Sequence, residues 1–173
     1  GCATGHFLAT AQALGKYTQM TGVDVAADAV AAVVAALGCS GYAGRIETMV
    51  APQQFDVVTM WETIEHIPEP VAALTALHAW LKPGGLLAIG TGDNTAILAR
   101  LLGRRWWYLV PPDHCIYYNP RALTEVLTRT GYKVIGLRRI WTHRVSAANV
   151  VMKLLRSADV APAKAVSLAK RVG

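Results

Sequence analysis

Short apolar runs alternate with segments of helical periodicity along most of this chain, and the alternation limits its fold more than any other feature. Strands are expected at the apolar runs that turn residues bound, namely 18–25, 55–61, 86–91 and 132–141, with a weaker one between 39 and 47. Helices are expected where apolar residues recur at helical spacing, at 6–16, 26–38, 69–85 and 120–130. Strands that alternate with helices form parallel sheets covered on both faces. The sequence therefore predicts an α/β fold with a doubly wound, Rossmann-like, mostly parallel sheet.

Length and composition fit this pattern into one domain. The chain has 173 residues, of which 53% are hydrophobic and 16% charged, enough to bury a single core. No stretch has the roughly 18 consecutive apolar residues of a membrane-spanning helix, and the first residues do not resemble a signal peptide. We therefore expect a cytoplasmic protein. The three cysteines have no paired spacing and predict reduced thiols.

The positive charge is concentrated near the C-terminus. Residues 138–173 contain eight Lys and Arg against Asp159 alone, within a net charge of +6. We expect residues 142–173 to be a basic helical segment of the domain whose main part is 1–141. A solvated helix face is the simpler interpretation of this charge, and contact with nucleic acid or an anionic membrane is the alternative.

A turn of small residues opens the chain directly before the first expected helix. Gly1, Ala3 and Gly5 in GCATGHF let a ligand approach the backbone at a helix amino end. Asp24 ends the next strand, where a carboxylate can accept hydrogen bonds from two ribose hydroxyls. Together these features indicate a nucleoside cofactor. The loop has the pattern GxAxG rather than GxGxxG, so it lacks the third glycine of a dinucleotide-binding loop.

Four successive segments resemble the motifs of class I S-adenosylmethionine-dependent methyltransferases: GCATGHF, GVDVAADAV, FDVVTMWETIEHIPEP and LKPGGLLAIGTGD. The resemblance extends from Gly1 to about Trp141 and is strongest to the branch that includes ubiquinone-biosynthesis O-methyltransferases. It implies S-adenosylmethionine as the cofactor and a small-molecule methyl acceptor.

The resemblance also implies which residues contact the cofactor: Gly1, Cys2, Ala3, Gly5, Asp24, Val25, Ile46, Glu47, Met60, Trp61 and Glu62. The opening loop would pass under the methionine portion, Asp24 would hold the ribose, and residues near Ile46 would border the adenine. Met60 and Trp61 would pack along the cofactor, and ordinary packing at a strand end is their alternative role. Ala3 replaces a commoner glycine, a change that a negative φ would tolerate.

In this family the glycine loop follows a central strand, and an antiparallel strand ends the sheet. Neither is recognisable in this sequence, so we expect the first and last strands to lie outside it and the chain to be a fragment. The strands at 18–25 and 55–61 are otherwise expected to be adjacent. Without the first strand they would lack a pairing partner, and each unpaired buried amide would lower the free energy of unfolding by about 1–3 kcal/mol. A strand donated by a partner chain is the alternative.

Methyl transfer is an in-line displacement at a sulfonium carbon, so the enzyme mainly aligns the acceptor and excludes water. A hydroxyl acceptor also needs a base, a task suited to histidine. His66, just past the strand at 55–61, and His114, in PPDHCIYYNP, are the candidate catalytic residues. Ordering of the loop is the alternative role for His66. No metal site is expected, because Asp56 begins a strand and would point away from Glu62, Glu65 and His66.

The segment 104–118, RRWWYLVPPDHCIYY, combines aromatic residues with two arginines. Such a segment can form a lid over a flat or acidic substrate. Peripheral membrane contact through this segment or the basic tail is the alternative. Nucleic acid is not expected as a substrate, because the Asn/Asp-Pro-Pro-aromatic loop of amino-methylating enzymes is absent from the sequence.

The sequence thus predicts an enzyme that transfers a methyl group from S-adenosylmethionine to a small molecule, foremost to a hydroxyl oxygen and otherwise to carbon or nitrogen. A degenerate domain that binds the cofactor and serves as a scaffold is one alternative. An NAD-linked reductase is another, and the loop glycines argue against it. Nothing in the sequence indicates an oligomeric state.

Overall fold

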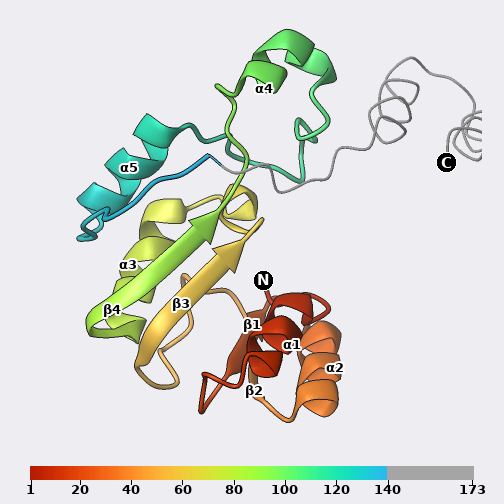
Figure 1. The fold of residues 1–173 in the computed structure, drawn as a ribbon, viewed down its shortest axis with the longest axis vertical. Helices are drawn as coiled ribbons and strands as arrows, with labels where there is room; N and C mark the ends of the chain where they lie inside the picture. The colour runs from red at the N-terminus through yellow and green to blue at the C-terminus, as the bar shows by residue number, and fades with distance from the viewer. Residues whose placement is uncertain (140–173) are drawn as a thin grey trace, which may run out of the picture.

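The computed structural model describes residues 1–139, so the basic segment expected at 142–173 lies outside the described residues. Helices and strands alternate along this part of the chain (Figure 1). In chain order they are α1 (His6–Ala13), β1 (Thr21–Asp24), α2 (Ala27–Leu37), β2 (Ser40–Ala43), β3 (Phe55–Trp61), the short helix η1 (Ile64–His66), α3 (Pro70–Trp80), β4 (Leu81–Gly90), α4 (Ile97–Leu102), η2 (Gly103–Arg105) and α5 (Pro120–Arg129).

The strands form two parallel pairs. β1 pairs with β2, where Val23 lies opposite Tyr42, and β3 pairs with β4, where Met60 lies opposite Ile89. A helix connects the strands of each pair, α2 in the first and α3 in the second, as parallel neighbours require. The α/β class and the parallel pairing predicted from the sequence are therefore confirmed.

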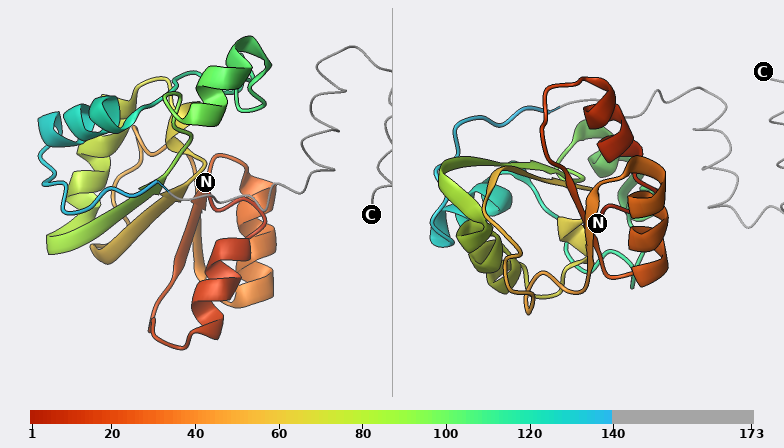
Figure 2. Two further views of the ribbon diagram at one scale, coloured as in Figure 1. Left: turned by 45° about the horizontal axis from the view of Figure 1, so that its top comes forward. Right: turned by 90° about the horizontal axis from the view of Figure 1, so that it is seen from below.

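β1 and β3 do not pair with each other within residues 1–139, so the adjacency expected for 18–25 and 55–61 is not observed. The backbone of the opening loop takes up part of the β1 edge instead, because the Cys2 N–H donates to the Val23 carbonyl at 2.8 Å. Figures 1 and 2 show the N-terminus between the two strand pairs. The loop thus lies where the two halves of the fold meet.

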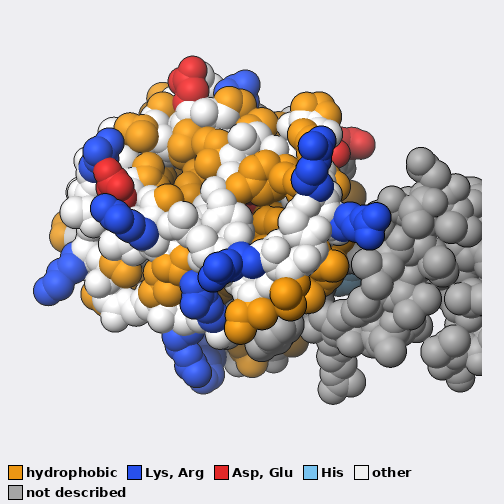
Figure 3. Space-filling view, turned by 90° about the horizontal axis from the view of Figure 1, so that it is seen from above, with side chains coloured by type: hydrophobic (Ala, Val, Ile, Leu, Met, Phe, Trp, Pro, Cys, Tyr) orange, Lys and Arg blue, Asp and Glu red, His pale blue; other side chains and the backbone are white. Residues whose placement is uncertain are grey.

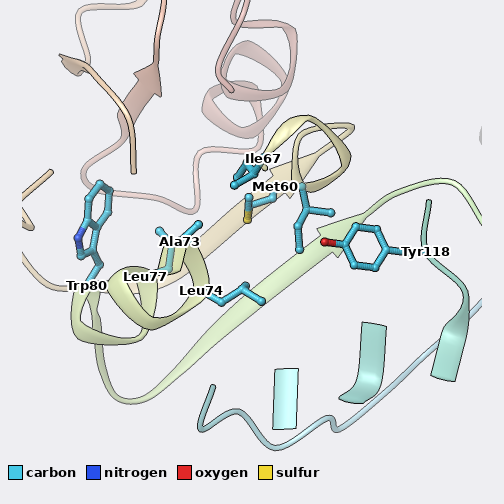
Figure 4. Close-up of a cluster of buried hydrophobic side chains, with 8 residues drawn as sticks. Met60, Ile67, Ala73, Leu74, Leu77, Trp80 and Tyr118 are labelled. Carbon is cyan, nitrogen blue, oxygen red and sulfur yellow. The ribbon is translucent and has the colours of Figure 1, made fainter. Parts of the chain in front are cut away.

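The main hydrophobic core lies between α3 and the β3–β4 sheet (Figure 4). α3 starts at Pro70, which is favoured in the first turn of a helix because it lacks an N–H. Leu74 and Leu77 are 0% and 1% exposed and point into this core. α5 continues the layer, since the Tyr132 hydroxyl just beyond it donates to the Leu74 carbonyl at 3.0 Å. The buried members of the cluster are Met60, Ile64, Ile67, Ala73, Leu74, Leu77, Trp80 and Tyr118.

The structure differs from the expected elements in three places. The helix expected at 69–85 ends at Trp80, and residues 81–85 begin β4, whose register with β3 is irregular there. The short helices α4 and η2 were not predicted. The strand expected at 132–141 is absent from 132–139, because a strand needs a partner's hydrogen bonds. Arg139 at the end of this stretch instead pairs with Asp93 at 2.6 Å.

The surface around α4 exposes apolar side chains next to basic ones. Ile97 and Leu101, four residues apart on α4, are each 77% exposed, and the exposed Arg104 and Arg105 follow them. Figure 3 shows the end of the molecule that carries α4, where apolar, Lys and Arg side chains are interspersed. In the part of the chain described, no helix has the length and apolar character needed to cross a membrane. Peripheral membrane contact stays a prediction.

The core assignment predicts unequal costs for two truncations on α3. Leu74→Ala should lower the free energy of unfolding by about 2–5 kcal/mol, because it leaves a cavity among buried side chains. Val71 lies on the same helix but is 54% exposed, so Val71→Ala should cost no more than about 0.5–1 kcal/mol. Urea denaturation followed by circular dichroism measures both. Equal losses would contradict the packing of α3 described above.

Candidate functional site

Asp24, the last residue of β1, fixes the opening loop. Its Oδ2 accepts a hydrogen bond from the Ala3 N–H at 2.9 Å, and its Oδ1 accepts one from the Ala26 N–H at 3.1 Å. Burial alone would raise the pKa of Asp24, but these hydrogen bonds outweigh it and hold the pKa below its ordinary value. The ionised carboxylate joins the loop to the start of α2. Each oxygen keeps a second lone pair for a ligand hydroxyl.

The loop places its backbone where side chains would not fit easily. A Cβ at Gly1 would lie 2.6 Å from Thr63 Oγ1, just beyond β3. Gly5, before α1, has φ +77°, a conformation that favours glycine. Ala3 has φ +43°, so it does not have the negative φ that would tolerate a methyl group there. The turn that directs the Ala3 N–H at Asp24 is left-handed, and an alanine there carries a strain of about 1–2 kcal/mol.

The residues expected near the adenine lie on the turn after β2. Glu47 forms an ion pair with Arg45 at 2.8 Å, and its side chain is only 10% exposed. Ile46 packs against the edge of the hydrophobic core. Val25, next to Asp24, is 72% exposed. Arg45 is therefore already paired with Glu47, one of the residues expected to border the adenine.

The residues at the end of β3 that are expected to contact the cofactor differ in their solvent exposure. Met60 is 3% exposed and belongs to the hydrophobic core, so its side chain is engaged in packing. Trp61 is 41% exposed and lies against Phe7 of α1, with 5.5 Å between ring centroids. Glu62 has φ +48°, and its N–H donates to the Gly90 carbonyl at 2.9 Å. Trp61 is thus the apolar side chain of this set with an open face.

Glu65 in η1 is a site residue that the sequence analysis did not single out. Its side chain is 0% exposed. One carboxylate oxygen accepts from Thr91 Oγ1 at 2.9 Å and the other from the Tyr108 hydroxyl, while the Glu65 carbonyl accepts from the Cys115 N–H at 2.8 Å. Burial and the hydrogen bond to Glu65 raise the pKa of Tyr108. The only sequence signal was its position beside His66.

The segment 104–118 folds back over the ends of β3 and β4 through Tyr108. The Gly92 N–H donates to the Tyr108 hydroxyl at 2.9 Å. A Cβ at Gly92 would overlap the Tyr108 ring, so the ring lies directly on the backbone. The His114 ring packs against Tyr108 with 4.3 Å between centroids. The segment therefore lies against the ends of β3 and β4, and its role as a lid over a substrate stays a prediction.

The fold brings the two candidate catalytic histidines, His66 and His114, together. Their ring centroids are 4.6 Å apart in an edge-to-face arrangement. His66 Nδ1 lies 2.7 Å from the Asp113 carbonyl, and His114 Nδ1 lies 2.8 Å from the Tyr108 carbonyl. A carbonyl oxygen only accepts hydrogen bonds, so each Nδ1 donates, and each neutral ring keeps its lone pair on Nε2.

The same place can hold a metal ion. Glu65, His66 and His114 each offer one donor atom, and these atoms all lie within 4.8 Å of one another. The sequence analysis expected no metal site because it compared acids that are close in sequence. Asp56 does lie apart, where it pairs with Lys82 at 2.9 Å. His114 was not considered as a ligand, because only the folding of 104–118 brings it to η1.

Comparisons with known proteins agree with this geometry. A family model described as a methyltransferase domain matches residues 1–137. Curated ubiquinone biosynthesis O-methyltransferases from Aeromonas salmonicida and Colwellia psychrerythraea are 30% and 31% identical to this chain over 115 residues. These matches cover 63% of this chain and 47% and 46% of the relatives. The chain therefore spans about half the length of the curated relatives it matches.

Solved structures share the fold. A Thermotoga maritima protein described as a SAM-dependent methyltransferase, possibly acting on histamine, has a TM-score of 0.62 at 22% identity, over 78% of this chain and 61% of its own. A Mesorhizobium loti S-adenosylmethionine-dependent methyltransferase has a TM-score of 0.61 at 17% identity, and the match covers 92% of this chain and 83% of that protein's chain. The chain therefore belongs to the methyltransferase domain family, and it shares its fold with S-adenosylmethionine-dependent methyltransferases.

Proposed function

We propose that this protein transfers the methyl group of S-adenosylmethionine to a hydroxyl oxygen of a small molecule. The observation that carries the proposal is that one fold contains two structures: a loop fixed by Asp24 and a histidine pair beyond β3. The first suits a nucleoside cofactor and the second suits removal of a hydroxyl proton. The names of the curated relatives, O-methyltransferases, support an oxygen acceptor.

The cofactor would lie across the opening loop and the end of β1. Asp24 would accept hydrogen bonds from the ribose through the lone pairs that Ala3 and Ala26 leave free. Trp61 would pack along the cofactor through its exposed face, whereas Met60 would contribute through its backbone. Glu62 would attract the ammonium group. The other proposed contacts are Gly1, Cys2, Gly5, Val25, Ile46 and Glu47.

The acceptor would bind under segment 104–118, with its hydroxyl behind the methyl carbon. His114 or its neighbour His66 takes the hydroxyl proton on Nε2. The oxygen electron pair then forms the new bond to the methyl carbon, while the carbon–sulfur bond breaks and its electrons return to sulfur. The products are a methyl ether and a neutral thioether. Tyr108, bonded to Glu65, keeps the segment over the strand ends, which excludes water.

Asp24→Asn should weaken the binding of S-adenosylhomocysteine at least tenfold. An amide cannot accept hydrogen bonds with both of its terminal atoms, and a hydrogen bond to a charged group contributes about 1.5–3 kcal/mol. Isothermal titration calorimetry measures the affinity. Asp28→Asn is the matched control, because Asp28 is exposed in the first turn of α2. Unchanged affinity in Asp24→Asn would remove Asp24 from the cofactor site.

The same variant tests the ionisation of Asp24. The pKa of Asp24 lies below its ordinary value of 3.8, so its contribution to stability is present above about pH 4 and is lost as the pH falls through the folded-state pKa. The difference in Tm between the original protein and Asp24→Asn should therefore be constant from about pH 5 to 8 and shrink below about pH 4. A difference that grows on acidification would contradict this assignment.

His114→Gln should lower turnover by at least about 100-fold, since proton removal contributes about 10²–10⁴ to the rate, and should leave cofactor affinity within about twofold. Labelled S-adenosylmethionine with a panel of phenols and polyols measures the transfer. His78→Gln is the control, because His78 is exposed on α3 and packs against Tyr132. Unchanged turnover would remove His114 from the mechanism. Cofactor binding without transfer to any acceptor would favour a scaffold.

A further inference from the structure

We propose that Tyr108 is a positioning residue for methyl transfer, because it holds the His114 imidazole in the orientation and tautomer that leave Nε2 free to take a proton. The proposal deepens the function proposed above and rests on it, since Tyr108 would act through the histidine base. Three features of Tyr108 support the inference: the anchoring of its hydroxyl, the packing of its ring and the hydrogen bond to its main-chain carbonyl.

The hydroxyl of Tyr108 is held by two separate elements. It donates a hydrogen bond to the buried carboxylate of Glu65 in η1, and it accepts one from the Gly92 N–H, just beyond β4, at 2.9 Å. A phenol hydroxyl has a single proton to donate, so the bond to Glu65 uses it. With a donor and an acceptor on different elements, the hydroxyl has little freedom to move. The end of this side chain is therefore fixed to η1 and the end of β4, outside its own segment.

The ring of Tyr108 supports the His114 ring directly. The two ring centroids are 4.3 Å apart, and Trp106 also packs on the Tyr108 ring, with 5.2 Å between centroids. The Tyr108 ring itself lies on the backbone of Gly92, where a Cβ would overlap it. Because packed aromatic rings restrict one another's movement, the position of the His114 ring depends on that of Tyr108.

The main-chain carbonyl of Tyr108 determines the tautomer of His114. It lies 2.8 Å from His114 Nδ1, and a carbonyl only accepts hydrogen bonds, so the proton of the neutral ring is on Nδ1. A neutral imidazole without such a partner can take either tautomer. The other tautomer would carry its proton on Nε2, which could then not accept one from a substrate hydroxyl. The carbonyl belongs to the residue whose side chain is anchored, so loss of the anchor would also displace the carbonyl.

The second histidine, His66, is held less firmly. Its Nδ1 lies 2.7 Å from the Asp113 carbonyl, but His66 and Asp113 are both exposed, and the ring contact described for His66 is with His114. A base must keep its lone pair directed at the reacting proton, and a displacement of about 1 Å can lower a rate about 100-fold. The restraints from Tyr108 therefore favour His114 over His66 as the base.

The tautomer of His114 can be measured without any acceptor. Long-range proton–nitrogen correlation spectra, recorded at mildly alkaline pH where imidazole is neutral, show which ring nitrogen carries the proton, and the signal missing from His114→Gln assigns that ring. Tyr108→Phe removes the hydroxyl but keeps the ring and the carbonyl. We expect the proton on Nδ1 in the original protein and a mixture of the two tautomers in Tyr108→Phe.

Tyr132→Phe is the matched control for this measurement. It removes another partly buried tyrosine hydroxyl, one that donates to the Leu74 carbonyl of α3, so it has a comparable structural cost but no contact with His114. Its His114 signals should match those of the original protein, and circular dichroism checks the fold of both variants. Unchanged His114 signals in folded Tyr108→Phe would overturn the inference.

Kinetics then tests whether this positioning matters for transfer. Tyr108→Phe should lower kcat at least tenfold with a smaller change in KM, whereas Tyr132→Phe should keep the original kcat. In a His114→Gln background, Tyr108→Phe should cause no further loss, because it acts through the ring that is already removed. A further tenfold loss in that background, or an unchanged kcat in Tyr108→Phe alone, would overturn the positioning role.

The two measurements also separate this inference from the proposed function. If the original protein transfers no methyl group to any hydroxyl acceptor, the proposed function fails. The spectra still decide whether Tyr108 sets the tautomer of His114, since they need neither cofactor nor acceptor.

Discussion

The buried carboxylate of Glu65 holds together the half of this molecule that contains the two histidines. It hydrogen-bonds to Thr91 at the end of β4 and to Tyr108 in the segment 104–118, and its own carbonyl binds the Cys115 N–H. Three stretches that are distant in sequence therefore meet at one side chain. Because a buried carboxylate needs most of its hydrogen bonds satisfied, the position of segment 104–118 is tied to η1, and His114 is carried with it.

The half proposed to bind the cofactor is organised by a second carboxylate, that of Asp24, which is more exposed to solvent than Glu65. Asp24 is partly exposed and ionised, and it orders the loop by accepting two backbone N–H groups while leaving lone pairs for a ligand. Glu65 is fully enclosed and directs its bonds inward. The opening loop links the halves, since Cys2 bonds to Val23 and Gly1 lies against Thr63. One carboxylate thus suits ligand binding and the other suits support of a reacting group.

Local sequence patterns were enough to predict most elements and the opening turn of small residues before α1. Apolar periodicity identified β1 to β4 and the helices α1, α2, α3 and α5, because these depend on short-range spacing and end signals. The path of segment 104–118 depends on the contact of Tyr108 with Glu65, which no local pattern encodes, so α4, η2 and the role of Glu65 were missed. The strand at 132–141 failed for a related reason: its apolar pattern was present, but within 132–139 it has no neighbour to pair with.

Both histidines are oriented by main-chain carbonyls, those of Asp113 and Tyr108, rather than by side chains. A main-chain carbonyl persists through almost any substitution that keeps the path of the chain. Many side chains between Trp106 and Tyr118 can therefore change over evolutionary time while the two rings keep their geometry. Relatives of this protein can thus diverge in the side chains of this segment and still retain the same arrangement of the two rings.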